Sequence, residues 1–132
     1  SDAVLIKENH LVFFKGPAGR MDLIHRVRRV KRSRRIVEME CRDKNEVLWA
    51  LDAGVDILLL DNVPIGKLSG FVRWVRNECV RRRIAAPALE VSGGVTLEVM
   101  PRLVRAGVDR ISIGRLTHSA PALDMSLDVD VR

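Results

Sequence analysis

Short apolar runs alternate with longer amphipathic runs along the chain, and this alternation constrains the fold more than any other feature of the sequence. The apolar runs have the length of strands, and the runs between them repeat their apolar residues at helical spacing. The expected strands cover residues 3–6, 36–41, 55–60, 89–91 and 110–113. The expected helices cover 22–32, 44–53, 66–82, 97–106, with Thr96 as the N-terminal cap of the last, and a short segment near Thr117 or Ser119. Strands separated by helices predict a parallel sheet with right-handed crossovers, its strands buried on both faces.

An internal repeat supports this interpretation. The residues Ala-Gly-Val-Asp occur at 53–56 and again at 106–109, each time between an expected helix and an expected strand. Glycine ends a helix readily because it adopts the left-handed conformation without steric cost. The repeat therefore indicates successive βα units of a barrel or an open α/β sheet, and a length of 132 residues is that of one domain.

Composition excludes several classes of protein. An apolar fraction of 47% and a charged fraction of 30% are those of a folded chain, not of a disordered one. The longest apolar run, residues 57–60, is far shorter than the ~20 residues that span a bilayer, and no basic segment of a signal peptide precedes the first apolar run. We therefore expect no membrane association and a cytoplasmic protein. Cys41 and Cys79 are far apart, which favours buried free thiols over a disulfide or a zinc site.

Polar residues or glycines follow every expected strand. In chain order they are Lys7, Glu8, Asn9 and His10; Glu38 and Glu40 near the end of their strand; Asp61 and Asn62; Ser92, Gly93 and Gly94; and Gly114, Arg115, Leu116, Thr117 and His118. In parallel α/β folds ligands bind at the carboxyl ends of the strands. The sequence therefore predicts a binding site made from these residues.

Two of these strand ends have the composition of anion-binding turns. Ser92-Gly93-Gly94 precedes an expected helix, whose first N–H groups are free to bind a phosphate. Gly114 followed by Thr117 offers a second such turn. Each turn alone is also compatible with a plain tight turn, but two neighbouring ones favour a phosphate site.

Charged residues at the other strand ends leave alternatives open. Glu40 and Asp61 suit Mg²⁺, which takes one or two carboxylates together with phosphate oxygens, but helix capping or salt bridges to arginines would also explain them. Glu38 alternates with Glu40, so one of the two glutamates is a candidate for a structural role. Lys7 is either a point charge for a carboxylate or diphosphate, or a solvated surface group.

The net charge of +6 favours anionic partners in general. Much of it lies in a basic run at residues 26–35, for which a solvated helix face, a nucleic-acid patch and an acidic interface are all compatible. No aromatic residues interleave with this run, and aromatics make up only 4% of the chain. Because single-stranded nucleic acids bind through aromatic stacking, nucleic acid is not the expected partner.

The strand-end motifs together resemble a known family. They are Asp2-Ala3-Val4-Leu5-Ile6-Lys7-Glu8-Asn9-His10, Val37-Glu38-Met39-Glu40, Leu59-Leu60-Asp61-Asn62, Glu90-Val91-Ser92-Gly93-Gly94 and Ile113-Gly114-Arg115-Leu116-Thr117-His118-Ser119. In order and spacing they are similar to the quinolinate phosphoribosyltransferases, the decarboxylating nicotinate-nucleotide pyrophosphorylases of NAD biosynthesis. That family has an N-terminal α/β sandwich domain and a C-terminal barrel of six strands, and joins quinolinate to phosphoribosyl pyrophosphate with Mg²⁺.

The resemblance assigns roles to individual residues. It implies that Lys7, Glu40 and Asp61 are catalytic and that Glu40 and Asp61 serve the metal. The substrate- and phosphate-binding residues that it implies are Lys7, His10, Ser92, Gly93, Gly94, Gly114, Arg115 and His118. It also implies that residues 1–132 form one partial TIM-like barrel of about four or five strands, without the sandwich domain and the first barrel strands.

The sequence departs from the family in two respects. It is short, so arginines, a histidine and a second lysine that grip the substrates are missing, and we expect the chain alone to be inactive. Arg115 stands where the family has a small residue, and it would either reach the phosphate or block the pocket. The chain is therefore a fragment of a longer enzyme, one chain of a split enzyme or a degenerate remnant, and a homo-oligomer or a complementing chain is expected. The alternative function is a truncated, non-catalytic basic module that binds phosphates, nucleic acid or a partner chain.

Overall fold

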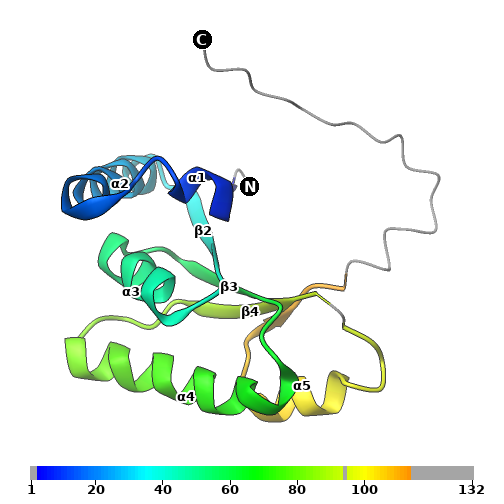
Figure 1. Cartoon of the computed structure of the whole chain (residues 1–132). Helices are drawn as coiled ribbons and strands as arrows, with labels where there is room; N and C mark the ends of the chain where they lie inside the picture. Colours follow the sequence, from blue (N-terminus) through cyan, green and yellow to red (C-terminus); the bar gives the residue numbers. More distant parts are fainter. Residues whose placement is uncertain (1–2, 94, 114–132) are drawn as a thin grey trace, which may run out of the picture.

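The computed structural model describes residues 3–93 and 95–113 and contains strands and helices in alternation (Figure 1). The elements are β1 (Ala3–Ile6), α1 (Glu8–Leu11), α2 (Gly16–Arg32), β2 (Ile36–Cys41), α3 (Lys44–Ala53), β3 (Ile57–Asp61), α4 (Ile65–Arg82), β4 (Ala88–Ser92), α5 (Met100–Ala106) and β5 (Arg110–Ile111). The predicted parallel βα repeat is confirmed. The short helix expected near Thr117 or Ser119 lies outside the described residues.

The five strands form one sheet in the order β1-β2-β3-β4-β5, and every neighbouring pair is parallel. Strands that follow one another in sequence order, joined by crossovers of one hand, place all their helices on the same face of the sheet. Figure 1 shows α2, α3 and α4 following one another around the outside of the sheet. This is the arrangement of a segment of an α/β barrel.

The core lies between the sheet and these helices. On β2, Val37, Met39 and Cys41 are fully buried, and the half-buried residues that alternate with them face the other way, as the two-residue period of a strand requires. Both cysteines are buried free thiols, as predicted. Burial on both faces is wrong for β2 and β4, because the described part of the chain supplies helices to one face only. We call the second face the open face.

The repeated Ala-Gly-Val-Asp segments perform the same structural task twice. In each, the glycine adopts a left-handed conformation, with φ of 74° at Gly54 and 85° at Gly107, and ends the preceding helix. The aspartate then binds the first part of the neighbouring strand through both its N–H and its carboxylate. Asp56 forms these bonds to Val37 at 2.8 and 2.9 Å, and Asp109 forms them to Leu89 at 2.9 and 2.7 Å. We call each of these contacts an aspartate latch.

Two helices begin elsewhere than the sequence predicts. Helix α2 starts at Gly16 rather than after residue 21, and Pro17 occupies its first turn, where a missing N–H costs nothing. Helix α5 starts at Met100, so the prediction that Thr96 caps it is wrong. Pro101 lies in the first turn of α5, and a separate turn precedes it. The short α1 was not predicted. Strands β1 and β2 have the predicted bounds, and the ends of β3, β4 and β5 differ from the expected ones by up to two residues.

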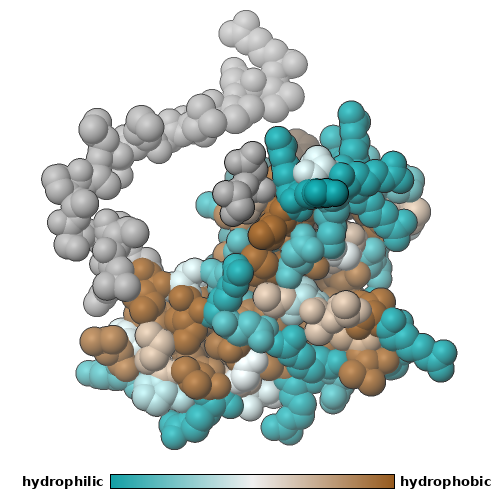
Figure 2. All heavy atoms as spheres, turned by 180° about the vertical axis from the view of Figure 1, so that it is seen from behind, coloured by the Kyte–Doolittle hydropathy of each residue, from teal (hydrophilic) through white to brown (hydrophobic). Residues whose placement is uncertain are grey.

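The basic run at residues 26–35 lies on α2 and the turn after it, and most of its side chains are exposed. Seen from behind, hydrophilic residues gather over α2, whereas hydrophobic ones gather around α5 (Figure 2). Arg26 pairs with Asp22, and Lys31 pairs with Asp56. The run therefore forms a solvated helix face, which is one of the interpretations that the sequence allows.

Charged side chains tie α2, α3 and α4 together. Asp52 on α3 pairs with Arg20 on α2 and, at 2.5 Å, with Arg82 on α4. Arg82 also bonds Glu78 at 2.6 Å, and Arg81 bonds the same carboxylate at 2.5 and 3.0 Å. These hydrogen bonds from Arg81 and Arg82 lower the pKa of Glu78 to about 2.

Replacing Glu78 with Gln should lower the stability of the chain at neutral pH and flatten its dependence on acid. A carboxylate whose pKa falls on folding stabilises the protein above its ordinary pKa, about 4.3, and loses that effect as the pH drops toward 2. Urea unfolding at several pH values measures this. The control Asp22→Asn removes an exposed pair and should change little. Parallel acid profiles for the parent and Glu78→Gln would contradict the prediction.

Candidate functional site

The carboxyl ends of the strands bring five of the predicted site residues to one end of the sheet. Lys7 follows β1, Glu40 lies near the end of β2, Asp61 ends β3, and Ser92 ends β4 with Gly93 directly after it. Asp61 and Ser92 are direct partners in the register of β3 and β4. Because Glu40, Asp61 and Ser92 alternate with buried residues, they belong to the open face.

The carboxylate of Asp61 accepts a hydrogen bond at each of its oxygens. The Ser92 hydroxyl donates to Oδ1 over 3.3 Å, and the Asn62 side-chain amide donates to Oδ2 over 2.8 Å. A carboxylate oxygen has two lone pairs, so each oxygen of Asp61 retains one after these two hydrogen bonds. Asp61 is therefore oriented by two neighbours and remains able to bind a cation.

Gly93 requires the freedom of glycine. Its φ is 84°, and a Cβ at this position would lie 2.6 Å from Oδ1 of Asn62. No side chain fits there unless Asn62 moves. The backbone after β4 thus passes directly over the side chain that holds Asp61, with no side chain of its own between it and a ligand.

Charged side chains of both signs lie near Glu40 and affect its pKa. Burial and the neighbouring Asp61 carboxylate raise the pKa of Glu40, and the Lys7 ammonium acts in the opposite direction. A raised pKa of this origin means that the two carboxylates repel each other. A cation placed between or beside them would relieve the repulsion.

His10 has a local role in the structure. The ring Nδ1 of His10 accepts a hydrogen bond from the backbone N–H of Lys7 over 3.1 Å, and the backbone N–H of His10 donates to the Lys7 carbonyl over 3.0 Å. These bonds close the short helix α1 directly after Lys7. His10 therefore fixes the backbone from which the Lys7 side chain leaves the sheet.

A second group of polar residues lies on the open face two residues before Glu40 and Ser92 along their strands. Glu90 on β4 accepts a hydrogen bond from Ser112 and lies 4.0 Å from Arg110. Burial raises the pKa of Glu38, and the Glu90 carboxylate raises it further. Of the two glutamates on β2, Glu40 therefore belongs to the end with Lys7 and Asp61, and Glu38 belongs to this lower group.

Some predicted residues cannot be placed, and others were not predicted. Gly94, Gly114, Arg115 and His118 lie outside the described residues, and with them the second predicted anion turn. The sequence places Asn62 among the strand-end residues of the predicted site but gives it no role of its own, and it does not single out Arg42. Arg42 pairs with Glu8 and, at 2.8 Å, with Glu46. The position of Asn62 directly after Asp61 was the one available signal, but its contact depends on a left-handed backbone that a sequence does not reveal.

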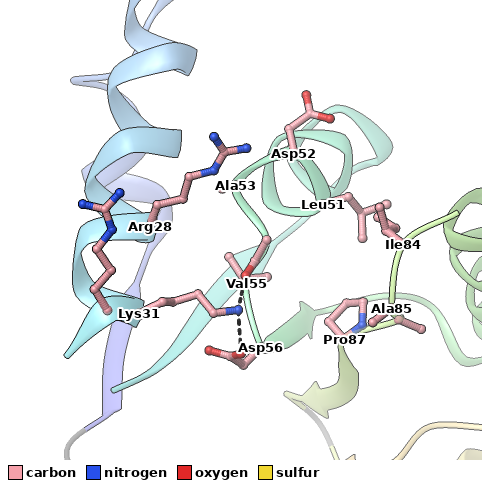
Figure 3. Close-up of a pocket in the computed structure, with 13 residues that line it drawn as sticks. Arg28, Lys31, Leu51, Asp52, Ala53, Val55, Asp56, Ile84, Ala85 and Pro87 are labelled. Carbon is pink, nitrogen blue, oxygen red and sulfur yellow. Dashed lines mark hydrogen bonds and ion pairs between the residues drawn. The ribbon is translucent and has the colours of Figure 1, made fainter. Parts of the chain in front are cut away.

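A groove lies at the opposite end of the sheet (Figure 3). It has a volume of about 690 Å³ and is lined by α2, the segment before β3 and the segment before β4. The Lys31 ammonium donates to the Gly54 carbonyl over 2.6 Å and pairs with Asp56 at 2.8 Å. Figure 3 shows the Lys31 side chain directed toward Asp56. Asp56 in this groove forms an aspartate latch, so the charged groups here hold the strands together. The candidate site is therefore the group of residues around Asp61, at the carboxyl ends of the strands.

A metal at this site would have few protein ligands. Among the described residues no group of three or more His, Cys, Asp or Glu side chains is arranged to hold a metal ion. Glu40 and Asp61 alone fit an ion that keeps several waters and shares its coordination with a substrate, which is how proteins bind Mg²⁺.

No described helix has the length and apolar character that crossing a membrane requires.

Comparisons with known proteins agree with this arrangement. Residues 1–128 match the family described as "Quinolinate phosphoribosyl transferase, C-terminal domain". The chain is 35% identical over 125 residues to a nicotinate-nucleotide pyrophosphorylase (carboxylating) of Rattus norvegicus, an alignment that covers 94% of this chain and 39% of the rat protein. A probable enzyme of the same name from Archaeoglobus fulgidus is 36% identical over 130 residues, covering 98% and 46%.

A solved structure agrees as well. The nicotinate-nucleotide pyrophosphorylase of Francisella tularensis superposes with a TM-score of 0.67 at 32% identity, covering 88% of this chain and 37% of that one. The chain spans less than half the length of these relatives. Because the family match extends over almost all of its residues, the chain belongs to the quinolinate phosphoribosyltransferase C-terminal domain family.

Proposed function

We propose that this chain forms the C-terminal part of the phosphoribosyl-transfer domain of a quinolinate phosphoribosyltransferase. Such an enzyme converts quinolinate and phosphoribosyl pyrophosphate to nicotinate mononucleotide, pyrophosphate and CO₂ in NAD biosynthesis. The observation that carries the proposal is the convergence of Lys7, Glu40, Asp61 and Ser92 at the carboxyl end of a parallel sheet, in a chain of this family.

The chemistry at this site is positioning and electrostatic stabilisation. The Glu40 and Asp61 carboxylates would stabilise the positive charge that develops at the ribose carbon as the diphosphate leaves. The Lys7 ammonium would bind an anionic oxygen of a substrate as a point charge. Ser92 and the backbone at Gly93 would bind the 5′-phosphate, since a glycine lets the backbone come close to a ligand.

Mg²⁺ is the proposed cofactor. Glu40 and Asp61 would hold it, and when bound it would neutralise charge on the diphosphate. The mutual repulsion of these two carboxylates supports a cation here, and burial together with Asp61 raises the pKa of Glu40. The affinity for the cation should therefore begin to fall at a higher pH than for an ordinary glutamate, because protonated Glu40 is a poor ligand.

We also propose that the remaining part of the site comes from outside these 132 residues, from a longer protein to which they belong, from a complementing chain or within a homo-oligomer, in the cytoplasm. Strand β1 lies at one edge of the described sheet, and an unpaired strand edge is a template for further pairing. A partner that adds strands there would complete the barrel and supply the cations that the anionic substrates need.

Replacing Asp61 with Ala should weaken the binding of phosphoribosyl pyrophosphate in the presence of Mg²⁺ by roughly tenfold or more, since a charged contact is lost. Isothermal titration calorimetry on the 132-residue chain measures this. Asp22→Ala, which removes a surface carboxylate on α2, is the control and should bind like the parent. Equal binding by all three chains, or a preference for unrelated polyanions such as single-stranded DNA, would support the non-catalytic basic module instead.

A further inference from the structure

Asn62 has an unusual backbone for its position at the end of a buried strand. Its φ is 53°, in the left-handed region that most residues avoid and that asparagine tolerates better than others. The chain therefore bends sharply after Asp61. This bend carries the Asn62 side chain back toward its neighbour on β3 and toward the turn after β4.

The contacts of the Asn62 amide join two parts of the site. Nδ2 donates to Oδ2 of Asp61 over 2.8 Å. Because a carboxylate accepts and does not donate, the amide must present its nitrogen here, which directs Oδ1 toward Gly93. A Cβ on Gly93 would lie 2.6 Å from that oxygen, so the backbone at Gly93 rests on the amide.

We infer that Asn62 is a positioning residue, which fixes the orientation of the Asp61 carboxylate and couples it to the backbone at Gly93. This inference rests on the proposed function, since it concerns how Asp61 meets Mg²⁺ and the phosphoribosyl group. Ser92 holds the other oxygen of Asp61 over 3.3 Å, and this longer bond leaves Asn62 as the closer of the two donors. Without the amide, Asp61 can rotate away from its productive orientation.

Asn62→Gly is the decisive substitution. Glycine keeps the left-handed backbone without strain and removes only the amide. We expect the melting temperature to stay close to that of the parent, and the affinity for phosphoribosyl pyrophosphate with Mg²⁺ to fall roughly tenfold, as for a lost hydrogen bond to a charged group. Arg83→Gly is the matched control, because Arg83 has a φ of 55° and precedes β4 at the other end of the sheet.

A double-mutant cycle separates positioning from general damage. If Asn62 acts through Asp61, the Asp61→Ala chain should lose no further affinity when Asn62→Gly is added. Additive losses would overturn the inference, and so would a parent-like affinity of Asn62→Gly. A parent chain that does not bind phosphoribosyl pyrophosphate at all would contradict the proposed function, and the functional part of the inference with it.

A ligand-free measurement tests the contact itself. Asparagine occurs only at positions 9, 45, 62 and 77, and glutamine is absent, so the side-chain amide region of a ¹⁵N NMR spectrum is simple. The Asn62 signal is the one that Asn62→Gly removes. It should shift in Asp61→Ala and stay in place in Asp22→Ala. An Asn62 signal that is unchanged in Asp61→Ala would overturn the inference whatever the binding experiments give.

Discussion

In an assay with Mg²⁺, quinolinate and phosphoribosyl pyrophosphate, the purified chain should form no nicotinate mononucleotide above the uncatalysed background. Both substrates are highly charged anions, and Lys7 is the one lysine or arginine at the described strand ends to which the family resemblance assigns a role. Arg42 is near, but it is engaged by Glu8 and Glu46. The basic residues of α2 lie on an exposed helix face and before β2, at the opposite end of the sheet.

The expected loss of activity is large. Each missing cationic contact to a desolvated anion costs roughly 2–5 kcal/mol, and ~1.4 kcal/mol changes a rate tenfold. Several missing contacts therefore remove many decades of rate. Turnover by the chain alone near ~1 s⁻¹, the low end for ordinary enzymes, would contradict this prediction.

The positive control for this assay is complementation. The chain corresponds to 39% of the length of its rat relative. The remaining N-terminal portion of such a relative, added as a separate chain, should restore product formation if it completes the site. Restoration that disappears with Asp61→Ala would show that the activity passes through the residues of this chain.

Gly93→Val should abolish measurable binding of phosphoribosyl pyrophosphate while the chain stays folded. Valine is strongly disfavoured at a φ of 84°, and its Cβ would have to displace the Asn62 amide from 2.6 Å. That displacement releases the Asp61 carboxylate and blocks the approach of a phosphate to the backbone. Two charge-assisted contacts of about 1.5–3 kcal/mol each are then lost, which is roughly a hundredfold or more in affinity.

Gly107→Val is the matched control for backbone strain. Gly107 has nearly the same φ, 85°, but a Cβ there would meet only Val72, at an ordinary 3.6 Å, at the other end of the sheet. Both variants should lose a similar amount of stability, about 1–2 kcal/mol for a left-handed residue with a side chain, as measured by urea unfolding. Only Gly93→Val should lose binding. Parallel losses of binding in the two variants would mean that strain, not the site, explains the result.

The order of strands and helices was predictable because each depends on the local spacing of apolar residues. Ile36–Cys41 and Lys44–Ala53 have the predicted bounds. The start of α2 was not predictable in the same way, because its first turn is poor in apolar residues and depends on Pro17 at a position where proline is tolerated. Thr96 was a plausible cap by residue type, but Pro101 sets the start of α5 further along the chain.

For the candidate site, sequence reasoning identified residue types at strand ends but not the contacts between them. That Asp61 faces Ser92 follows from the register of β3 and β4, which a single sequence does not contain. The part played by Asn62 depends on one left-handed backbone angle and on the absence of a side chain at Gly93. The assignment of Glu40 and Glu38 to different groups depends on their charged neighbours, Asp61 and Glu90.

The aspartates at the two ends of the sheet have different roles. The carboxylates of Asp56 and Asp109 accept hydrogen bonds from backbone N–H groups where strands begin. The Asp61 carboxylate lies where its strand ends, and it retains free lone pairs. Selection for thermal tolerance and selection for a new substrate therefore act on different residues of each βα unit. Residues at the carboxyl ends of the strands can therefore change without loss of the latches that hold the strands together. In the same way, substitutions near the latches can raise stability without altering the candidate site.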